Sequence, residues 1–152
     1  MSPPETAPLL VKKPRPDQSI NQAQAAVNRA KELLGLPWIH QGRNPALGLD
    51  CAGLAVECGL AAGLPVEVPA DYSRVVDPAI LIENILKYCE EVPVTDIQAG
   101  DLMLMHCNEV PQHLGIYIGD DWFIHSYIKH GIAQQQLIPF WRNRITHVFR
   151  IV

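Results

Sequence analysis

The order of hydrophobic and polar positions divides the chain into a helical first half and a strand-rich last third. A first helix is predicted over about residues 20–34, and its apolar side chains recur at helical spacing on one face: Ile20, Ala23, Val27, Ala30 and Leu34. Ser19 and Gln22 resemble a capping box at its start, and Gly35 with Pro37 ends it. This face is expected to pack in the core.

Two further helices are predicted before the strands begin. The pattern of residues 51–62 is helical and almost wholly apolar, and Gly63 and Pro65 close it. A third helix is expected to begin at Asp77, as the N-cap, with Pro78 in the first helical position, and to run to about Cys89.

The last third alternates apolar and polar residues at a period of two, which is typical of strands. Gly, Asp, Asn and Pro residues separate five candidate strands: 101–106, 113–118, 122–127, 132–138 and 145–151. Helices followed by an antiparallel meander predict an α+β fold.

Composition narrows the class of protein. The chain has 152 residues, 48% hydrophobic and 18% charged, which predicts one globular domain. A net charge of −4 argues against a nucleic-acid partner, and no run has the length of a membrane span. Residues 1–18 hold five prolines and are expected to form a flexible arm, leaving 19–152 as the domain.

The stretch LDCAGLAVECGLAAGL, residues 49–64, places two cysteines on the second predicted helix. Cys51 lies at its N-terminal end, where unpaired N–H groups favour a thiolate and lower its pKa. The same groups could bind the oxyanion of a tetrahedral intermediate. Cys58 is two turns deeper and is expected to be core. A buried thiol is the ordinary interpretation of both, so a catalytic Cys51 needs a base elsewhere.

His113 and His125 are the best placed of the six histidines to act on a thiol. They lie on two candidate strands joined through Gly119-Asp120-Asp121, and a three-residue loop would make them diagonal neighbours on one face. An even-residue loop would place them on opposite faces. Gly115, on the face of His113, is expected to leave room for an approaching group. The alternatives are two polar residues at a sheet edge, or a zinc site with Cys51, which lacks the usual short ligand spacing.

Several motifs together resemble the NlpC family of cell-wall cysteine peptidases, whose other namesake is the p-sixty protein. They are DCAGL at 50–54, GD at 100–101, and HLGIYIG at 113–119 followed by a histidine at 125. The resemblance implies a papain-like fold, with the nucleophile helix packed on a five- to six-stranded antiparallel sheet. It implies Cys51 as nucleophile, His113 as base and His125 as the residue that orients His113, with no cofactor or metal.

The resemblance also implies the substrate. Family members cut peptidoglycan stem peptides, typically between D-γ-glutamyl and a diamino acid. The residues expected to contact substrate are Trp38, His40, Asp50, Tyr72, Ser73 and Arg74. Trp38 stands where the family often has a tyrosine near the nucleophile, so a hydroxyl role is lost there. Arg74 would suit a carboxylate.

More narrowly, three segments are similar to a phage-tail or prophage branch of the family: PWIHQG, DYSR and the closing WRNRITHVFR. The first residues have no apolar core behind a basic start, and the four cysteines have no paired spacing, so the protein is expected to be made in the bacterial cytoplasm without a signal peptide, which fits a phage-tail protein. It would act at the cell wall, within a phage tail or after lysis, with other tail proteins as partners. The alternatives are an inactive tail-assembly or wall-binding domain, and an amidase or acyltransferase with the same three residues.

Overall fold

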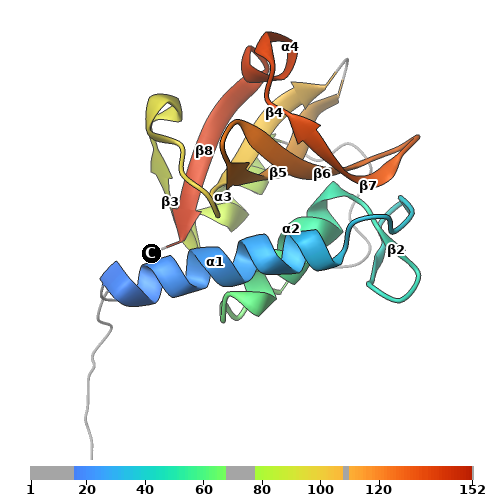
Figure 1. Cartoon of the computed structure of the whole chain (residues 1–152), viewed down its shortest axis with the longest axis horizontal. Helices are drawn as coiled ribbons and strands as arrows, with labels where there is room; N and C mark the ends of the chain where they lie inside the picture. The colour runs from blue at the N-terminus through green and yellow to red at the C-terminus, as the bar shows by residue number, and fades with distance from the viewer. Residues whose placement is uncertain (1–15, 68–77, 108–109, 152) are drawn as a thin grey trace, which may run out of the picture.

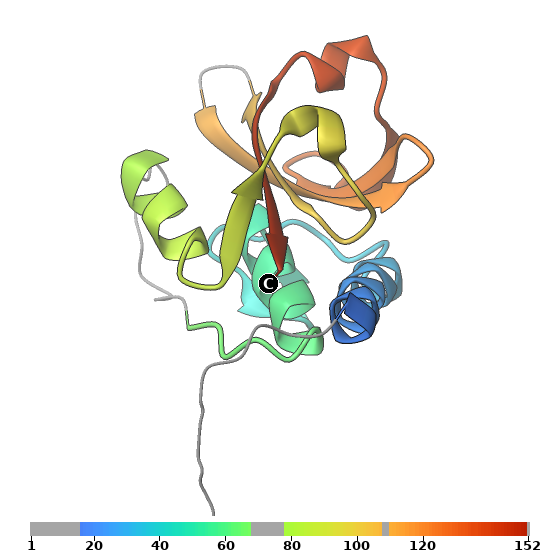
Figure 2. The same cartoon turned by 90° about the vertical axis from the view of Figure 1, so that its left-hand side faces the viewer.

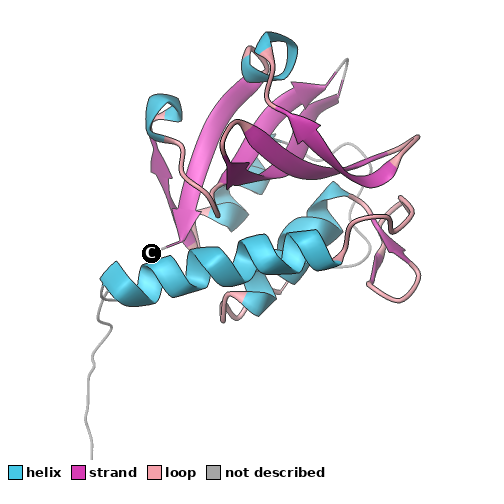
Figure 3. Cartoon of the chain, in the orientation of Figure 1, coloured by secondary structure: helices cyan, strands magenta, loops and turns pink. Residues whose placement is uncertain are grey.

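A computed structural model describes residues 16–67, 78–107 and 110–151, and residues 1–15 of the predicted arm lie outside it. The fold is α+β, as predicted: α1, α2 and α3 lie along one side of a six-stranded antiparallel sheet with strand order β3-β8-β4-β5-β6-β7, and the short α4 lies away from them (Figures 1 and 3). Viewed from the side, α2 lies between α1 and α3 (Figure 2). None of the described helices has the length and apolar character needed to cross a membrane.

The helices are α1 (Pro16–Glu32), α2 (Cys51–Ala61), α3 (Pro78–Ile85) and the short α4 (Pro139–Arg142), with a 3₁₀ turn η2 (Val94–Asp96). The sheet strands are β3 (Cys89–Val92), β4 (Leu102–Cys107), β5 (Val110–Gly119), β6 (Trp122–Tyr127), β7 (Gly131–Gln136) and β8 (Ile145–Ile151). A separate two-stranded hairpin, β1 (Arg43–Asn44) and β2 (Gly48–Leu49), precedes α2.

Helix α1 differs from the prediction at both ends. It begins at Pro16, so Ser19 lies inside the helix, and Gln22 donates to the carbonyl of Ala62 instead of forming a capping box. Its buried apolar side chains are Ala26, Val27 and Ala30, and Leu33, in the turn that follows the helix, is buried with them. Leu34, predicted as core, is 40% exposed, because the face that packs on α2 and the sheet runs through its neighbour.

The third helix is shorter than predicted. It ends at Ile85, and Cys89 begins strand β3, which pairs antiparallel with β8 from Cys89↔Ile151 to Val92↔Val148. Pairing with β8 therefore decides the conformation of these residues against their local helical pattern. Asp77, the predicted cap, lies outside the described residues.

A β-bulge sets the relation between β5 and β6. The strands are joined by a two-residue turn, Asp120-Asp121, with positive φ angles of 52° and 64°, not by the predicted three-residue loop. The register shifts between Gly119↔Trp122 and Tyr117↔Phe123, which leaves Ile118 as an extra residue on β5. An even turn alone would separate His113 and His125 onto opposite faces. The bulge restores them to one face.

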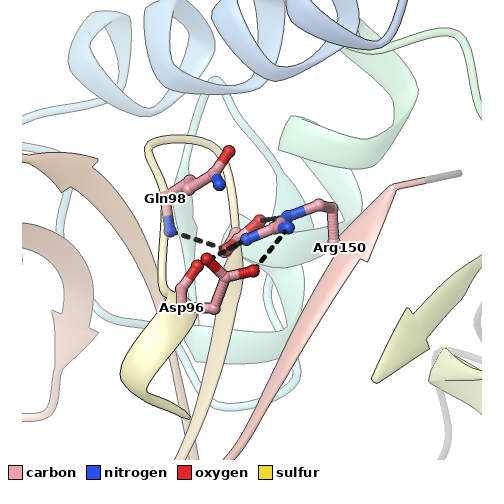
Figure 4. A network of polar contacts seen from close by, with 4 residues as sticks. Asp96, Gln98 and Arg150 are labelled. Carbon is pink, nitrogen blue, oxygen red and sulfur yellow. Dashed lines mark hydrogen bonds and ion pairs between the residues drawn. The ribbon is translucent and has the colours of Figure 1, made fainter. Parts of the chain in front are cut away.

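The GD pair at 100–101 fixes the turn before β4 to the last strand, whose Arg150 lies beside Asp96 and Gln98 of that turn (Figure 4). Gly100 has a φ of 96° and approaches α1 so closely that a Cβ would collide with Ala23. Asp101 is 2% exposed and accepts hydrogen bonds from the Gln98 amide at 2.8 Å and from Arg150 Nε and Nη2 at 3.0 and 2.9 Å. The role of this motif is therefore structural.

Candidate active site

The DCAGL segment forms the first turn of α2, and most of its residues have a structural reason to be there. Asp50 is the N-cap: its Oδ1 accepts a hydrogen bond from the Gly53 amide at 2.8 Å and an ion pair from Arg43 at 2.8 Å. A Cβ at Gly53 would collide with the carbonyl of Gly42, and Leu54 is 1% exposed in the core. Cys51 is the first residue of the helix, and these contacts fix the position of its thiol.

The two predicted histidines meet on neighbouring strands. His113 Nε2 lies 2.7 Å from His125 Nδ1, and the rings are edge to face, with centroids 5.0 Å apart. Gly115 pairs directly with His125, so His113 is its diagonal neighbour on the same face, as predicted. Both side chains are buried, at 7% and 3% exposure.

The start of α2 lies where β5 and β6 separate. The β5–β6 ladder ends at Gly115↔His125, whereas the β4–β5 ladder continues through Leu104↔Leu114 and Met105↔His113. The backbone of Leu114 lies close enough to hydrogen-bond the Cys51 thiol and lowers its pKa. The thiol is thus next to the residue that follows His113 in the chain.

Burial governs the protonation of all three side chains. Desolvation raises the pKa of Cys51 to about 11, although hydrogen bonds from the backbone of Leu114 and Ala52 act the other way. The lowered thiol pKa expected at a helix N-terminus is therefore not found. Desolvation also lowers the pKa of His113 to about 4 and that of His125 to about 3. At pH 7 the site holds a neutral thiol and two neutral imidazoles.

Aromatic side chains surround the histidine pair, and the sequence analysis did not predict that they would cluster there. The ring centroids of Phe123, Trp141 and Tyr127 lie 4.8, 5.1 and 5.6 Å from that of His125. Trp141 packs against the two histidines themselves. Their same-face positions two residues on either side of His125 could have indicated Phe123 and Tyr127.

Gly115 does not provide the open space that was expected beside His113. A Cβ built on Gly115 would lie 3.0 Å from Phe123 Cδ2 and 3.1 Å from Met105 Cε. Side chains of the core already fill the volume over this glycine. Its lack of a side chain therefore permits close packing of the sheet behind the histidines.

Comparison with known proteins decides the family. The model of the NlpC/P60 family matches residues 35–150, which include the thiol and both histidines. The chain belongs to the NlpC/P60 family. This confirms the resemblance at family level, and the fold agrees with it.

Named relatives and solved structures extend this result. The probable endopeptidase YafL of Escherichia coli K12 is 30% identical over 143 residues, covering 90% of this chain and 53% of YafL. The murein DD-endopeptidase MepS/murein LD-carboxypeptidase of the same strain is 28% identical over 64 residues, 41% of this chain and 34% of the relative. The chain thus spans about half of YafL and a third of MepS. Their names agree with the endopeptidase class predicted from the sequence.

Two solved structures share the fold. A Staphylococcus aureus protein described as similar to a lipoprotein of the NLP/P60 family superposes with a TM-score of 0.64 at 23% identity, covering 87% of this chain and 42% of its own. The NlpC/p60 domain of the peptidoglycan hydrolase SagA superposes with a TM-score of 0.59 at 17% identity, covering 85% and 98%. None of these four proteins is named as a phage protein.

Three of the six residues expected to contact substrate in this NlpC/P60 domain are among the described residues. Trp38 and His40 stack at 6.2 Å between ring centroids, in a loop whose Pro37 carbonyl accepts from the Leu49 amide, two residues before the thiol. The contacts of Asp50 show helix capping, and its predicted substrate role stays a prediction. Tyr72, Ser73 and Arg74 lie outside the described residues. Within the described ranges, no group of three or more His, Cys, Asp or Glu residues is arranged to hold a metal ion.

Proposed function

We propose that this chain is a cysteine endopeptidase that cleaves peptidoglycan stem peptides with Cys51, His113 and His125. The observation that carries the proposal is the 2.7 Å contact between His113 Nε2 and His125 Nδ1, on strands that flank the start of α2. A nucleophilic thiol requires a base held by a third group, and this pair supplies a base and its support. The names of YafL and MepS favour the same reaction class.

The histidine contact determines which ring nitrogens take part. For His113 Nδ1 to accept the thiol proton, the proton of His113 must stay on Nε2, from which it donates to His125 Nδ1. His125 then carries its own proton on Nε2. The same hydrogen bond persists when His113 becomes an imidazolium, so His125 stabilises the charged form without moving.

The reaction then proceeds in two halves. Cys51 Sγ attacks the amide carbon as His113 takes the thiol proton, and the oxyanion forms near the first-turn amides of α2. The Gly53 amide is already bound to Asp50, so the first-turn donors proposed for the oxyanion are the amides of Cys51 and of Ala52, the latter within hydrogen-bonding reach of the thiol. His113 passes its proton to the leaving amine, and the C–N bond breaks. Water, deprotonated by His113, hydrolyses the thioester and restores the thiol.

The proposed bond is the amide between D-γ-glutamyl and a diamino acid, taken from the family resemblance. We assign Trp38 and His40 to the rim of the substrate groove, because their loop hydrogen-bonds to the segment that leads into Cys51. Trp38 presents an indole N–H where a hydroxyl is often found, so it can donate to the substrate but cannot accept from it.

The experiment is digestion of purified cell wall and of a γ-D-glutamyl–diamino acid peptide, with products identified by mass. Wild type is expected to cut and Cys51→Ala to be inactive while retaining its unfolding midpoint. Cys58→Ala is the matched control, since this thiol lies on the same helix but is 2% exposed in the core. A Cys51→Ala protein that cut as fast as wild type would refute the assignment. Amide and ester substrates tested in parallel would reveal the amidase or acyltransferase alternative.

We further propose that the protein acts at the cell wall, in association with a phage tail. This setting is supported by the segments PWIHQG, DYSR and WRNRITHVFR alone. Co-purification of the chain with tail particles from an induced lysogen tests it. If the chain is absent from such particles and the free protein still cleaves cell wall, the association with a phage tail is refuted and the proposed enzymatic activity stands.

A further inference from the structure

We infer that Ser126 is a positioning residue that holds the nucleophile helix against the histidine strand, an inference that rests on the proposed function. Ser126 Oγ donates to the Leu49 carbonyl at 2.6 Å, across 77 positions of sequence. Ser126 follows His125 directly, and Leu49 lies two residues before Cys51. One short hydrogen bond therefore connects the backbone on either side of the thiol–imidazole site.

The bond lies just beyond the end of the β5–β6 ladder. Continuing the β5–β6 register beyond Gly115↔His125 would pair Leu114 with Ser126, but the described ladder stops before that pair. Instead the backbone of Leu114 contacts Cys51, and the hydroxyl of Ser126 contacts Leu49. The two strands thus separate around the start of α2: Leu114 contacts its first residue, and Ser126 binds the residue before its cap.

Both partners of this hydrogen bond are buried, so its loss would leave a buried polar group without a partner. Ser126 is 1% exposed and Leu49 is 0% exposed, so water cannot readily replace either partner. Leu49 is also held by its amide, which donates to the Pro37 carbonyl at 3.1 Å. Both backbone polar groups of Leu49, the residue before the helix cap, are therefore hydrogen-bonded. Loss of the Ser126 hydroxyl would leave the Leu49 carbonyl without this donor and allow the start of α2 to shift.

A shift of this kind changes the rate of the chemical step more than the binding of substrate. Catalytic groups must meet in a near-attack geometry, and misplacement by about 1 Å can cost about 100-fold in rate. Ser126→Ala is therefore expected to lower kcat at least about tenfold while KM stays within about twofold. Ser126→Thr keeps the hydroxyl donor and is expected to recover most of the loss. Thr146→Val is the matched control, because Thr146, on β8, also donates from its hydroxyl to a backbone carbonyl, that of Leu104 on β4.

The second measurement does not depend on the substrate. Alkylation of Cys51 by iodoacetamide, followed from pH 4 to 10 with Cys51→Ala as blank, reports how well His113 assists the thiol. Ser126→Ala should lose at least about tenfold of the rate near neutral pH, and Thr146→Val should match wild type. The inference is overturned if Ser126→Ala retains both rates within about twofold, or if Thr146→Val loses as much. If wild type cuts no wall peptide, the proposed function fails, and the alkylation rates still decide the role of Ser126.

Discussion

Burial of the histidine pair predicts that the fold loses stability in mild acid. His113 has its pKa lowered to about 4 by desolvation, against an ordinary value of 6.5. The folded protein therefore binds fewer protons than the unfolded chain between these two pH values. Unfolding is then favoured by falling pH, and the stability rises again as pH increases through this range. Below about pH 4 the full penalty is present, and above about pH 6.5 it is absent.

The size of the effect follows from the shift. One pKa unit corresponds to about 1.36 kcal/mol, so the full displacement for His113 is about 3.4 kcal/mol, and about 2.5 kcal/mol of it falls between pH 7.5 and pH 4.5. His125 shifts in the same direction, to a pKa of about 3, because of burial and the nearby charges of His113 and His130. A domain of this kind has a total stability of about 5–15 kcal/mol, so the loss is a large fraction of it.

The assay is urea unfolding followed by tryptophan fluorescence at pH 4.5, 5.5, 6.5 and 7.5. Wild type is compared with His113→Gln, which removes the titrating ring, and with His40→Gln, which removes an exposed histidine. The stability difference between wild type and His113→Gln should change by about 2.5 kcal/mol across this range, with wild type losing more in acid. A difference that stays constant within about 0.5 kcal/mol would show that His113 is not desolvated in the fold. That result would refute the reasoning.

Three further predictions address activity and packing. The acid limb of kcat/KM should lie well below pH 6.5, near the pKa of about 4 of His113, because the neutral imidazole is the base; a pH profile on a soluble peptide measures it. Asp101→Asn should lower the free energy of unfolding by about 2–4 kcal/mol, because Arg150 loses its buried carboxylate partner; urea unfolding measures it, and Asp120→Asn is the exposed control. Deleting Ile118 should leave the rate of thiol alkylation near neutral pH close to that of wild type, because removal of the extra residue gives a regular two-residue hairpin in which Gly115 still pairs with His125 and His113 stays on the same face; loss of alkylation in this variant would contradict the assigned register.

The parts of the fold that the sequence predicted well have local signals. Helix α2 begins at Cys51 as expected, because Asp50 is a strong N-cap and Gly63 marks the end. Strands β6 and β8 match the predicted ranges 122–127 and 145–151, since each alternates cleanly between turn residues. Strand β3 had no such signal, because only its pairing with β8 distinguishes it from the end of a helix.

Some features of the candidate site could likewise be predicted from the sequence, and others could not. His113 and His125 could be placed on one face from their period-two spacing, and the structure brings them together. A two-residue turn with a bulge, and not the predicted three-residue loop, places them on one face. The spacing of the histidines in the sequence does not show where a bulge will form. Ser126 gave no sequence signal of its own, since its partner is a backbone carbonyl 77 positions away. The raised pKa of Cys51 also needed the structure, because desolvation depends on what packs around the thiol.

The bulge at Ile118 has a consequence for how this chain is aligned with others. A relative that lacks one residue at Ile118 can form the same strand pairs without the bulge, and both histidines then stay on one face. A relative that lacks one residue but keeps the bulge would place the two histidines on opposite faces. A single-residue gap between His113 and His125 is therefore compatible with a shared site when the bulge is lost with it.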